Sequence, residues 1–405
     1  MSELLKCSCR REEEETRTAS PCGLGNPRGW RLVTSAAKMF QGVVKSAPRK
    51  PCFPLVLLVG VLIFSGCGTY SRRGLDPVRA RQIQQAVLPG KPRLANALAD
   101  QILALNPEAV TARDVAEVLA HAPAPQIILI HGGLASVIDE MVSFSDFLRG
   151  MGYPGVSLTN AGDGTYTFSC YESSEMIAGV AAWYYEQEGL RPMMVGHSQG
   201  GIQAIKVLHQ LAGHFETTLF VYNPLTWQKE QRDEIKDPLT GEKRPVVGLK
   251  LPYVSSVGAG GLTRVLPNQW EMNFKLRTIP DSVEEFTGFC KKNDLLGGDY
   301  LGYGPANESE ASGVAVVRNV WLPTVYDHGR IPDTKHLLRS QAIKDWINDY
   351  RASPEPVVYP KLDVAFVGDS RHILWASDVW YSIKKHWVLE LQRLIHAQRL
   401  QRHDN

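Results

Sequence analysis

The chain has 405 residues, of which 44% are hydrophobic and 21% are charged, a composition typical of a globular protein with a sizeable core. Its formal net charge of +2 arises in the first 66 residues, which carry ten Lys and Arg against five Asp and Glu. The remaining chain holds 34 of the 44 basic and 37 of the 42 acidic side chains, so we expect no nucleic-acid partner. The seven cysteines form no Cys-x-x-Cys pair and no zinc-like cluster with histidine, so we expect no bound metal.

Residues 1–38 are polar and include a run of two arginines and four glutamates. Such a segment lacks the apolar pattern needed to bury a core, which predicts disorder. Met39 offers a second start of translation, in which case residues 1–38 are an untranslated extension.

Residues 39–66 have the pattern of an export signal. Basic residues precede an uncharged apolar stretch, residues 53–65, whose length suits a signal peptide and is short for a membrane-spanning helix. The stretch leads into Ser-Gly and then Cys67, and small residues before a cysteine resemble the lipobox of bacterial lipoprotein signal peptides. This resemblance implies that Cys67 is lipidated and begins the mature chain. A plain secretory signal or a single helical anchor is the alternative, since residues 51–71 carry no charge.

Residues 67–123 contain three stretches with apolar residues near helical spacing, and Thr111 is suited to cap the last of them. The Ala-Pro-Ala-Pro sequence at residues 122–125 breaks the pattern. We interpret residues 67–123 as a helical spacer between the anchor and the body of the protein.

Beyond this spacer, predicted strands and helices alternate. The strands are expected at residues 126–130, 156–162, 192–195 and 217–224, and the helices at residues 173–189 and 199–213. This alternation predicts an α/β fold with a mostly parallel central sheet.

Two sequences suited to nucleophilic chemistry follow two of these strands. Gly-His-Ser-Gln-Gly at residues 196–200 fits the G-x-S-x-G pattern, in which small residues permit a sharp turn that exposes the serine hydroxyl. His-Gly-Gly at residues 131–133 follows the first strand, and glycine lets a backbone N–H approach a ligand closely. Backbone N–H groups of this kind stabilise an oxyanion.

The order of these two sequences and their strands resembles the α/β-hydrolase superfamily, nearest to its lipases and esterases, over residues 124–352. The resemblance implies an eight-stranded, mostly parallel sheet and a Ser, acid, His order along the chain. It makes Ser198 the nucleophile and the N–H groups of Gly133 and Gln199 the oxyanion hole. It implies no metal and no cofactor.

The base is expected after the last predicted strand, residues 314–322. The following loop offers His328 and His336. His336 opens an amphipathic helical pattern, and in members of the superfamily the base often lies just before such a closing helix. We therefore predict His336 as the base, with His328 as the alternative.

The acid is expected after the predicted strand at residues 283–290, where apolar and polar residues alternate. Asp294 follows this strand directly and is the predicted acid, which would orient the histidine. Asp299 is the second candidate. Both lie among turn-forming residues, so a purely structural turn is the alternative.

Residues 225–275 interrupt the strand pattern and are predicted to form a cap insertion over the serine. Aromatic residues in this segment either line an acyl pocket or pack the cap onto the body; they are Trp227, Tyr253, Trp270 and Phe274. Residues 353–405 are read as a C-terminal extension with no assigned role.

Together these features predict an exported, lipid-anchored serine hydrolase of the cell envelope that cleaves carboxylic esters or lipids. An outer membrane is expected if the host has one, because no aspartate follows Cys67. An amidase, thioesterase or peptidase on the same fold, or a non-catalytic envelope lipoprotein, remains an alternative. The sequence leaves open whether Cys170 and Cys290 form a disulfide.

Overall fold

The computed structural model describes Val78, Gln82 and residues 94–133, 136–260, 267–298, 307–353 and 370–403. The predictions for residues 1–66 and for Cys67 lie outside this part of the chain. All described residues belong to one compact unit, Val61–Asn405. Within the described residues, no helix is both long and apolar enough to cross a membrane.

A five-stranded, entirely parallel sheet forms the centre of the fold. Its strands, in spatial and also in chain order, are β1 (Ile127–Ile130), β2 (Met193–His197), β7 (Leu251–Val257), β9 (Val283–Lys291) and β11 (Val316–Leu322). β1 and β2 are buried along their whole length, because helices cover both faces of the sheet. The prediction of an α/β fold with a mostly parallel sheet is confirmed.

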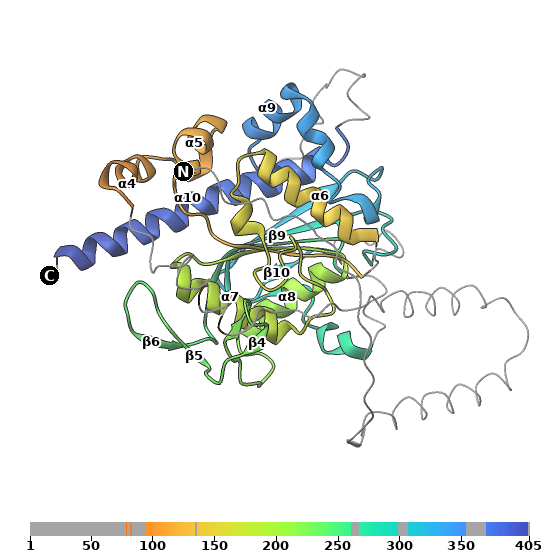
Figure 1. Cartoon of the computed structure of the whole chain (residues 1–405). Coiled ribbons are helices and arrows are strands. Elements are labelled where there is room, and N and C mark those ends of the chain that lie inside the picture. The colour runs from red at the N-terminus through yellow and green to blue at the C-terminus, as the bar shows by residue number, and fades with distance from the viewer. Residues whose placement is uncertain are drawn as a thin grey trace, which may run out of the picture. The chain divides into compact units, whose positions relative to one another are not determined.

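Helices form a layer on each face of the sheet (Figure 1). One layer contains α6 (Ser136–Gly150) and α10 (Ile373–His403), and the other contains α7 (Ser174–Glu188) and α8 (Gln199–Leu211). Successive side chains of a strand point to opposite faces of the sheet. Leu129 packs in the core with α6 and α10, whereas Ile130 packs with α7 and α8. A helix over residues 173–189 and a strand over residues 126–130 were predicted, and both are confirmed within a residue or two.

The described parts of the predicted spacer, residues 94–123, and of the C-terminal extension, residues 370–403, contribute to the hydrophobic core, which corrects the boundaries placed at residues 124 and 352. The spacer residues form α4 (Asn96–Leu103) and α5 (Ala112–Glu117), whose apolar sides pack with α10. Gln392 of α10 donates to the carbonyl groups of Ile102 and Leu105, at 3.1 and 3.0 Å. Four tryptophans are among the largest fully buried side chains, and three of them, at positions 375, 380 and 387, lie on α10.

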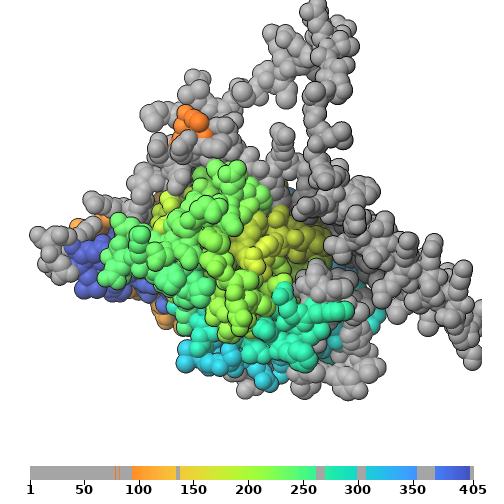
Figure 2. Space-filling view, turned by 90° about the horizontal axis from the view of Figure 1, so that it is seen from below, coloured from red at the N-terminus to blue at the C-terminus, as the bar shows by residue number. Residues whose placement is uncertain are grey.

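The predicted cap insertion, residues 225–275, is wrong in its main feature because it contains β7, the middle strand of the sheet. The residues before β7 form two small hairpins, β3 (Tyr222–Asn223) with β4 (Gln228–Lys229) and β5 (Glu234–Lys236) with β6 (Lys243–Pro245). Figure 2, which views the face that carries α7 and α8, shows this green segment forming much of its surface.

The second hairpin lies at the end of α7 that is next to the start of β2. There Arg232 forms an ion pair with Glu186, and Tyr185 donates to Asp237 at 3.0 Å. Ser198 follows the opposite end of β2, so this hairpin does not cap the serine. Among the four aromatic residues of the segment, Tyr253 is fully buried in β7 and Trp227 stacks on Phe168, whereas Trp270 and Phe274 are exposed.

Two other predicted strands are absent from the sheet. Residues 156–162 form a 3₁₀ turn, Gly155–Leu158, and a following loop, while residues 217–224 contribute only β3. A single parallel bridge between Ile130 and Phe168 is the only pairing on the outer side of β1 within the described residues. The resemblance to α/β-hydrolases implies eight strands, and the described sheet has five.

Two short strands and one further helix accompany the central sheet. β8 (Thr278–Ile279) and β10 (Glu310–Ala311) form a two-stranded parallel pair, and α9 (Gln341–Asp349) packs against α10. β9 and β11 run in register up to the pair of Lys291 and Leu322. The loops that follow these two strands therefore start side by side at the carboxyl edge of the sheet.

Candidate active site

Ser198 lies in a sharp turn between β2 and α8. Its backbone has φ 55° and ψ −118°, a conformation that non-glycine residues rarely adopt and that stores strain. A Cβ atom at Gly196 would collide with the carbonyl oxygen of Gly200, and one at Gly200 would collide with that of Ile130. The two glycines are therefore required by close backbone packing, which holds the serine in its strained turn.

His328 lies directly against the serine hydroxyl. Its Nε2 atom is 2.9 Å from Ser198 Oγ, and its Nδ1 atom is 2.8 Å from Asp294 Oδ2. The histidine occupies a 3₁₀ turn, His328–Arg330, six residues beyond the end of β11. Gly258, at φ +63°, makes room for the ring, since a Cβ atom there would lie 2.7 Å from His328 Cε1. The three side chains form one continuous hydrogen-bonded chain.

Asp294 lies where it was predicted, three residues after the end of β9, and it is buried. Burial alone would raise the pKa of its carboxyl group, but the hydrogen bond and charge of His328 and the N–H of Gly297 outweigh burial and lower this pKa. The Gly297 N–H donates to Oδ1 at 2.9 Å. With one oxygen held by Gly297, the other accepts the Nδ1–H of His328, which leaves the Nε2 lone pair of the histidine facing the serine.

The prediction that His336 contacts the serine is wrong. His336 lies in a second 3₁₀ turn, Lys335–Arg339, and its Nε2 donates to the carbonyl of Arg371 at 3.1 Å. The helical pattern that begins at His336 is in fact two elements, because Ser340 is extended and caps the start of α9. His336 therefore does not precede the closing helix directly, and the histidine beside the serine hydroxyl is the alternative candidate, His328. Asp299, the second candidate acid, lies outside the described residues.

The two predicted oxyanion residues are brought together beside the serine. Gln199 is the first residue of α8, where backbone N–H groups point toward the helix start and favour negative charge. Gly133 follows β1, and a Cβ atom there would collide with the Gln199 side chain. The hydroxyl of Tyr171 donates to the Gly133 carbonyl at 2.7 Å, which fixes the orientation of this loop. Sequence reasoning missed Tyr171, which carries no local signal for this contact.

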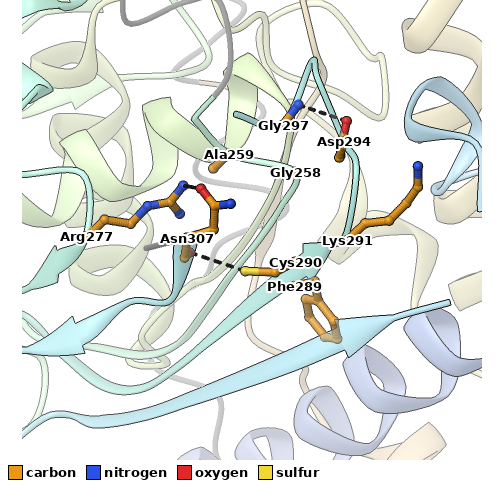
Figure 3. A pocket seen from close by; sticks show the side chains of 9 residues that line it. All are labelled: Gly258, Ala259, Arg277, Phe289, Cys290, Lys291, Asp294, Gly297 and Asn307. Atoms are coloured by element: carbon orange, nitrogen blue, oxygen red, sulfur yellow. Dashed lines mark hydrogen bonds between the residues drawn. The ribbon is translucent and has the colours of Figure 1, made fainter. Parts of the chain in front are cut away.

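A small cavity lies next to Asp294 (Figure 3). Its volume is about 10 Å³, enough for about one water molecule and too small for an ester. The lining residues are Gly258, Ala259, Arg277, Phe289, Cys290, Lys291, Asp294, Gly297 and Asn307. The thiol of Cys290 donates to the carbonyl of Asn307 at 3.2 Å. Cys170 and Cys290 are both free thiols, so they do not form a disulfide with each other.

Within the described residues, no group of three or more His, Cys, Asp or Glu is arranged to hold a metal ion. The described site brings together a serine hydroxyl, a histidine ring, a buried carboxylate and backbone N–H groups. No match to a protein-family model, to a curated protein sequence or to a solved structure was found.

Proposed function

We propose that this chain is a serine hydrolase of the α/β-hydrolase type that cleaves carboxylic esters. The observation that carries the proposal is the hydrogen-bonded chain from Ser198 through His328 to Asp294, which begins at a strained turn between a strand and a helix. A lone hydroxyl is a weak nucleophile, and an adjacent base that is oriented by a carboxylate activates it.

The proposed reaction follows from the positions of these groups. The Nε2 atom of His328 removes the proton from Ser198 Oγ as this oxygen attacks the ester carbonyl, and the resulting oxyanion is held by the N–H groups of Gly133 and Gln199. His328 then returns the proton to the leaving alcohol, and water cleaves the acyl-enzyme by the reverse sequence of proton transfers. Asp294 stays ionised, holds the histidine ring and stabilises its protonated form.

The arrangement of the chain supports the proposal independently of the residue types. The serine, the acid and the base follow β2, β9 and β11, in the Ser, acid, His order of α/β-hydrolases. All three leave the sheet at its carboxyl edge, where open parallel sheets bind their ligands. The glycine-containing loop after β1, which is next to β2 in the sheet, is in the position expected for an oxyanion loop.

An activity-based probe tests the nucleophile. A fluorophosphonate should label the full-length wild-type protein, and Ser198→Ala should abolish the labelling. Ser370→Ala is the control, because Ser370 is a buried serine that lies outside the proposed triad. A wild-type protein that resists the probe under conditions that label a known esterase would favour a non-catalytic lipoprotein.

The choice of esters rests on the resemblance to lipases and esterases, since the same triad serves amidases, thioesterases and peptidases. A series of p-nitrophenyl esters from short to long acyl chains separates these activities and reports chain-length preference. Turnover of a peptide substrate with no turnover across the ester series would reassign the enzyme to the peptidases.

We further propose that the enzyme is anchored in the cell envelope through lipidated Cys67. Transfer of a diacylglyceryl group from a lipid donor to its sulfur, cleavage before this residue and transfer of an acyl group to the amino group that cleavage frees would give it three acyl chains, and two or more chains anchor a protein stably. Metabolic labelling with a palmitate analogue should mark the wild-type protein and should fail in Cys67→Ser. Label that persists in this variant would contradict the anchor.

A further inference from the structure

His197, the residue before the nucleophile, contacts the loop that carries the base. It is the last residue of β2 and its side chain is fully buried. Its Nε2 atom lies 2.7 Å from the backbone carbonyl oxygen of His328. A carbonyl oxygen only accepts, so Nε2 carries the proton and donates it. This hydrogen bond connects the end of β2, next to Ser198, to the backbone of His328, 131 residues further along the chain.

The other ring nitrogen of His197 faces the oxyanion loop. A Cβ atom at Gly132 would lie 3.2 Å from His197 Nδ1 and 3.2 Å from Ser198 Cβ, so the ring packs directly against this glycine. No described residue donates a hydrogen bond to Nδ1, which is buried. A buried nitrogen without a hydrogen bond is uncommon in a folded protein. These contacts place the His197 ring between the loop that carries His328 and the loop that carries Gly132.

The surroundings keep His197 neutral. Burial and the nearby His328 together lower the pKa of its imidazole to about 3, in opposition to the hydrogen bond with the His328 carbonyl. The other titratable groups that act on it are Asp294, beyond β9, and His131, at the end of β1. The neutral ring donates its Nε2–H to the His328 carbonyl, and this bond does not depend on which protonation state the His328 ring has.

We propose that His197 is a positioning residue that holds the backbone of His328, and thereby the Nε2 atom of the base, within reach of Ser198 Oγ. The inference rests on the proposed hydrolase function and deepens it. An apolar residue would fill the same space but would release the His328 carbonyl. Only a side chain with a donor at the position of Nε2 retains both the packing and the hydrogen bond to the His328 carbonyl.

Two variants and one control separate positioning from general stability. His197→Leu removes the donor, and His197→Gln retains an N–H group near the position of Nε2. His209→Leu is the matched control: His209 is buried on α8, its Nε2 donates to the Lys275 carbonyl at 3.0 Å, and burial lowers its pKa to about 4. Each chain is compared for kcat, KM, fluorophosphonate labelling rate and thermal unfolding.

A misplacement of about 1 Å at a catalytic group can cost about 100-fold in rate. We therefore expect His197→Leu to lower kcat and the labelling rate by about 10- to 100-fold with little change in KM. His197→Gln should recover most of this loss, and His209→Leu should unfold at a lower temperature without a comparable loss of kcat. If His197→Leu keeps the wild-type kcat, or if Gln rescues no better than Leu, the positioning role is wrong.

An NMR measurement tests the positioning role of His197 without an activity assay. The Nδ1 proton of His328, which Asp294 accepts, is followed by NMR and assigned by its loss in His328→Ala. In His197→Leu it should exchange with water faster than in the wild type and in the His209→Leu control. Unchanged exchange would overturn the positioning role even in an active enzyme, whereas absent labelling of the wild type would overturn the hydrolase proposal instead.

Discussion

The two histidines that follow β11 provide the sharpest test of the proposed triad. His328→Ala removes a ring that is 2.9 Å from the serine hydroxyl and 2.8 Å from Asp294, whereas His336→Ala removes a ring whose Nε2 donates to the backbone carbonyl of Arg371 at 3.1 Å. Both changes delete the same side chain within one short stretch. The pair therefore isolates the effect of position from that of residue type.

The expected magnitudes differ by many powers of ten. Loss of the histidine of a serine triad costs about 10⁶ in kcat, and at about 1.4 kcal/mol per tenfold this corresponds to roughly 8 kcal/mol of transition-state stabilisation. His336→Ala loses one neutral hydrogen bond, worth about 1 kcal/mol of folding stability, and no contact with the reacting atoms. Its kcat should stay within a few-fold of the wild type while its melting temperature falls by a few degrees.

The assay is hydrolysis of the best p-nitrophenyl ester by full-length protein in detergent, with circular dichroism melts of each variant. A double variant, Ser198→Ala with His328→Ala, should be hardly slower than either single variant, because the residues of a triad act as a unit. Asp294→Ala should cost less than either, about 10⁴. If His336→Ala is inactive while folded and His328→Ala retains activity, the base is His336 and the described geometry does not represent the working site.

Two further predictions concern the surroundings of the triad, and a third concerns a carboxyl group at the opposite edge of the sheet. Gly200→Ala should give a misfolded or strongly destabilised protein, seen as lost soluble yield or a much lower melting temperature, because the new methyl group has no space beside the end of β1. Tyr171→Phe should lower kcat by a few-fold to tenfold at unchanged KM, since it releases the Gly133 carbonyl; an unchanged kcat would argue against Gly133 as an oxyanion donor. Glu188 has a pKa that burial raises from 4.5 to about 8, so the folded state binds its proton more tightly and stability falls as the pH rises from 4.5 through 8. Glu188→Gln, whose amide replaces the neutral acid beside Gln126, should therefore raise the melting temperature above pH 8 and leave it nearly unchanged near pH 4.5.

The sequence was sufficient to predict the class of the fold, because apolar runs of strand length alternate with longer helical patterns. It failed at β7, which contains Pro252 and two adjacent serines. Proline is rare inside central strands, and buried serines hide the apolar pattern, so the strand was placed within a cap. The helical patterns of α4 and α10 were visible, but their packing against each other depends on contacts between segments about 270 residues or more apart in the sequence, which no local pattern reports.

The candidate site was predictable wherever the functional residue lies close to the end of its strand. Ser198 follows β2 at once, and Gly133 and Asp294 each lie three residues beyond their strands. The chain can depart from a strand end by only about 3.3 Å per residue, so such residues must remain near the carboxyl edge of the sheet. His328 is six residues from the end of β11, whereas His336 is fourteen residues away and can be far from this edge.

The shorter path from the end of β11 favours His328 over His336, whatever helix follows. The helical pattern at His336 was misleading because Ser340 interrupts it, and only the backbone conformation reveals the break. What no sequence pattern supplies is the register between β9 and β11, which ends both strands at the same level of the sheet. That register, together with the space left by Gly258, brings the base loop over Asp294 and Ser198. Gly258→Ala should therefore displace the His328 ring and lower kcat while Ser198 remains in its strained turn. An alanine variant with full activity would show that the ring does not pack against residue 258 in the working enzyme.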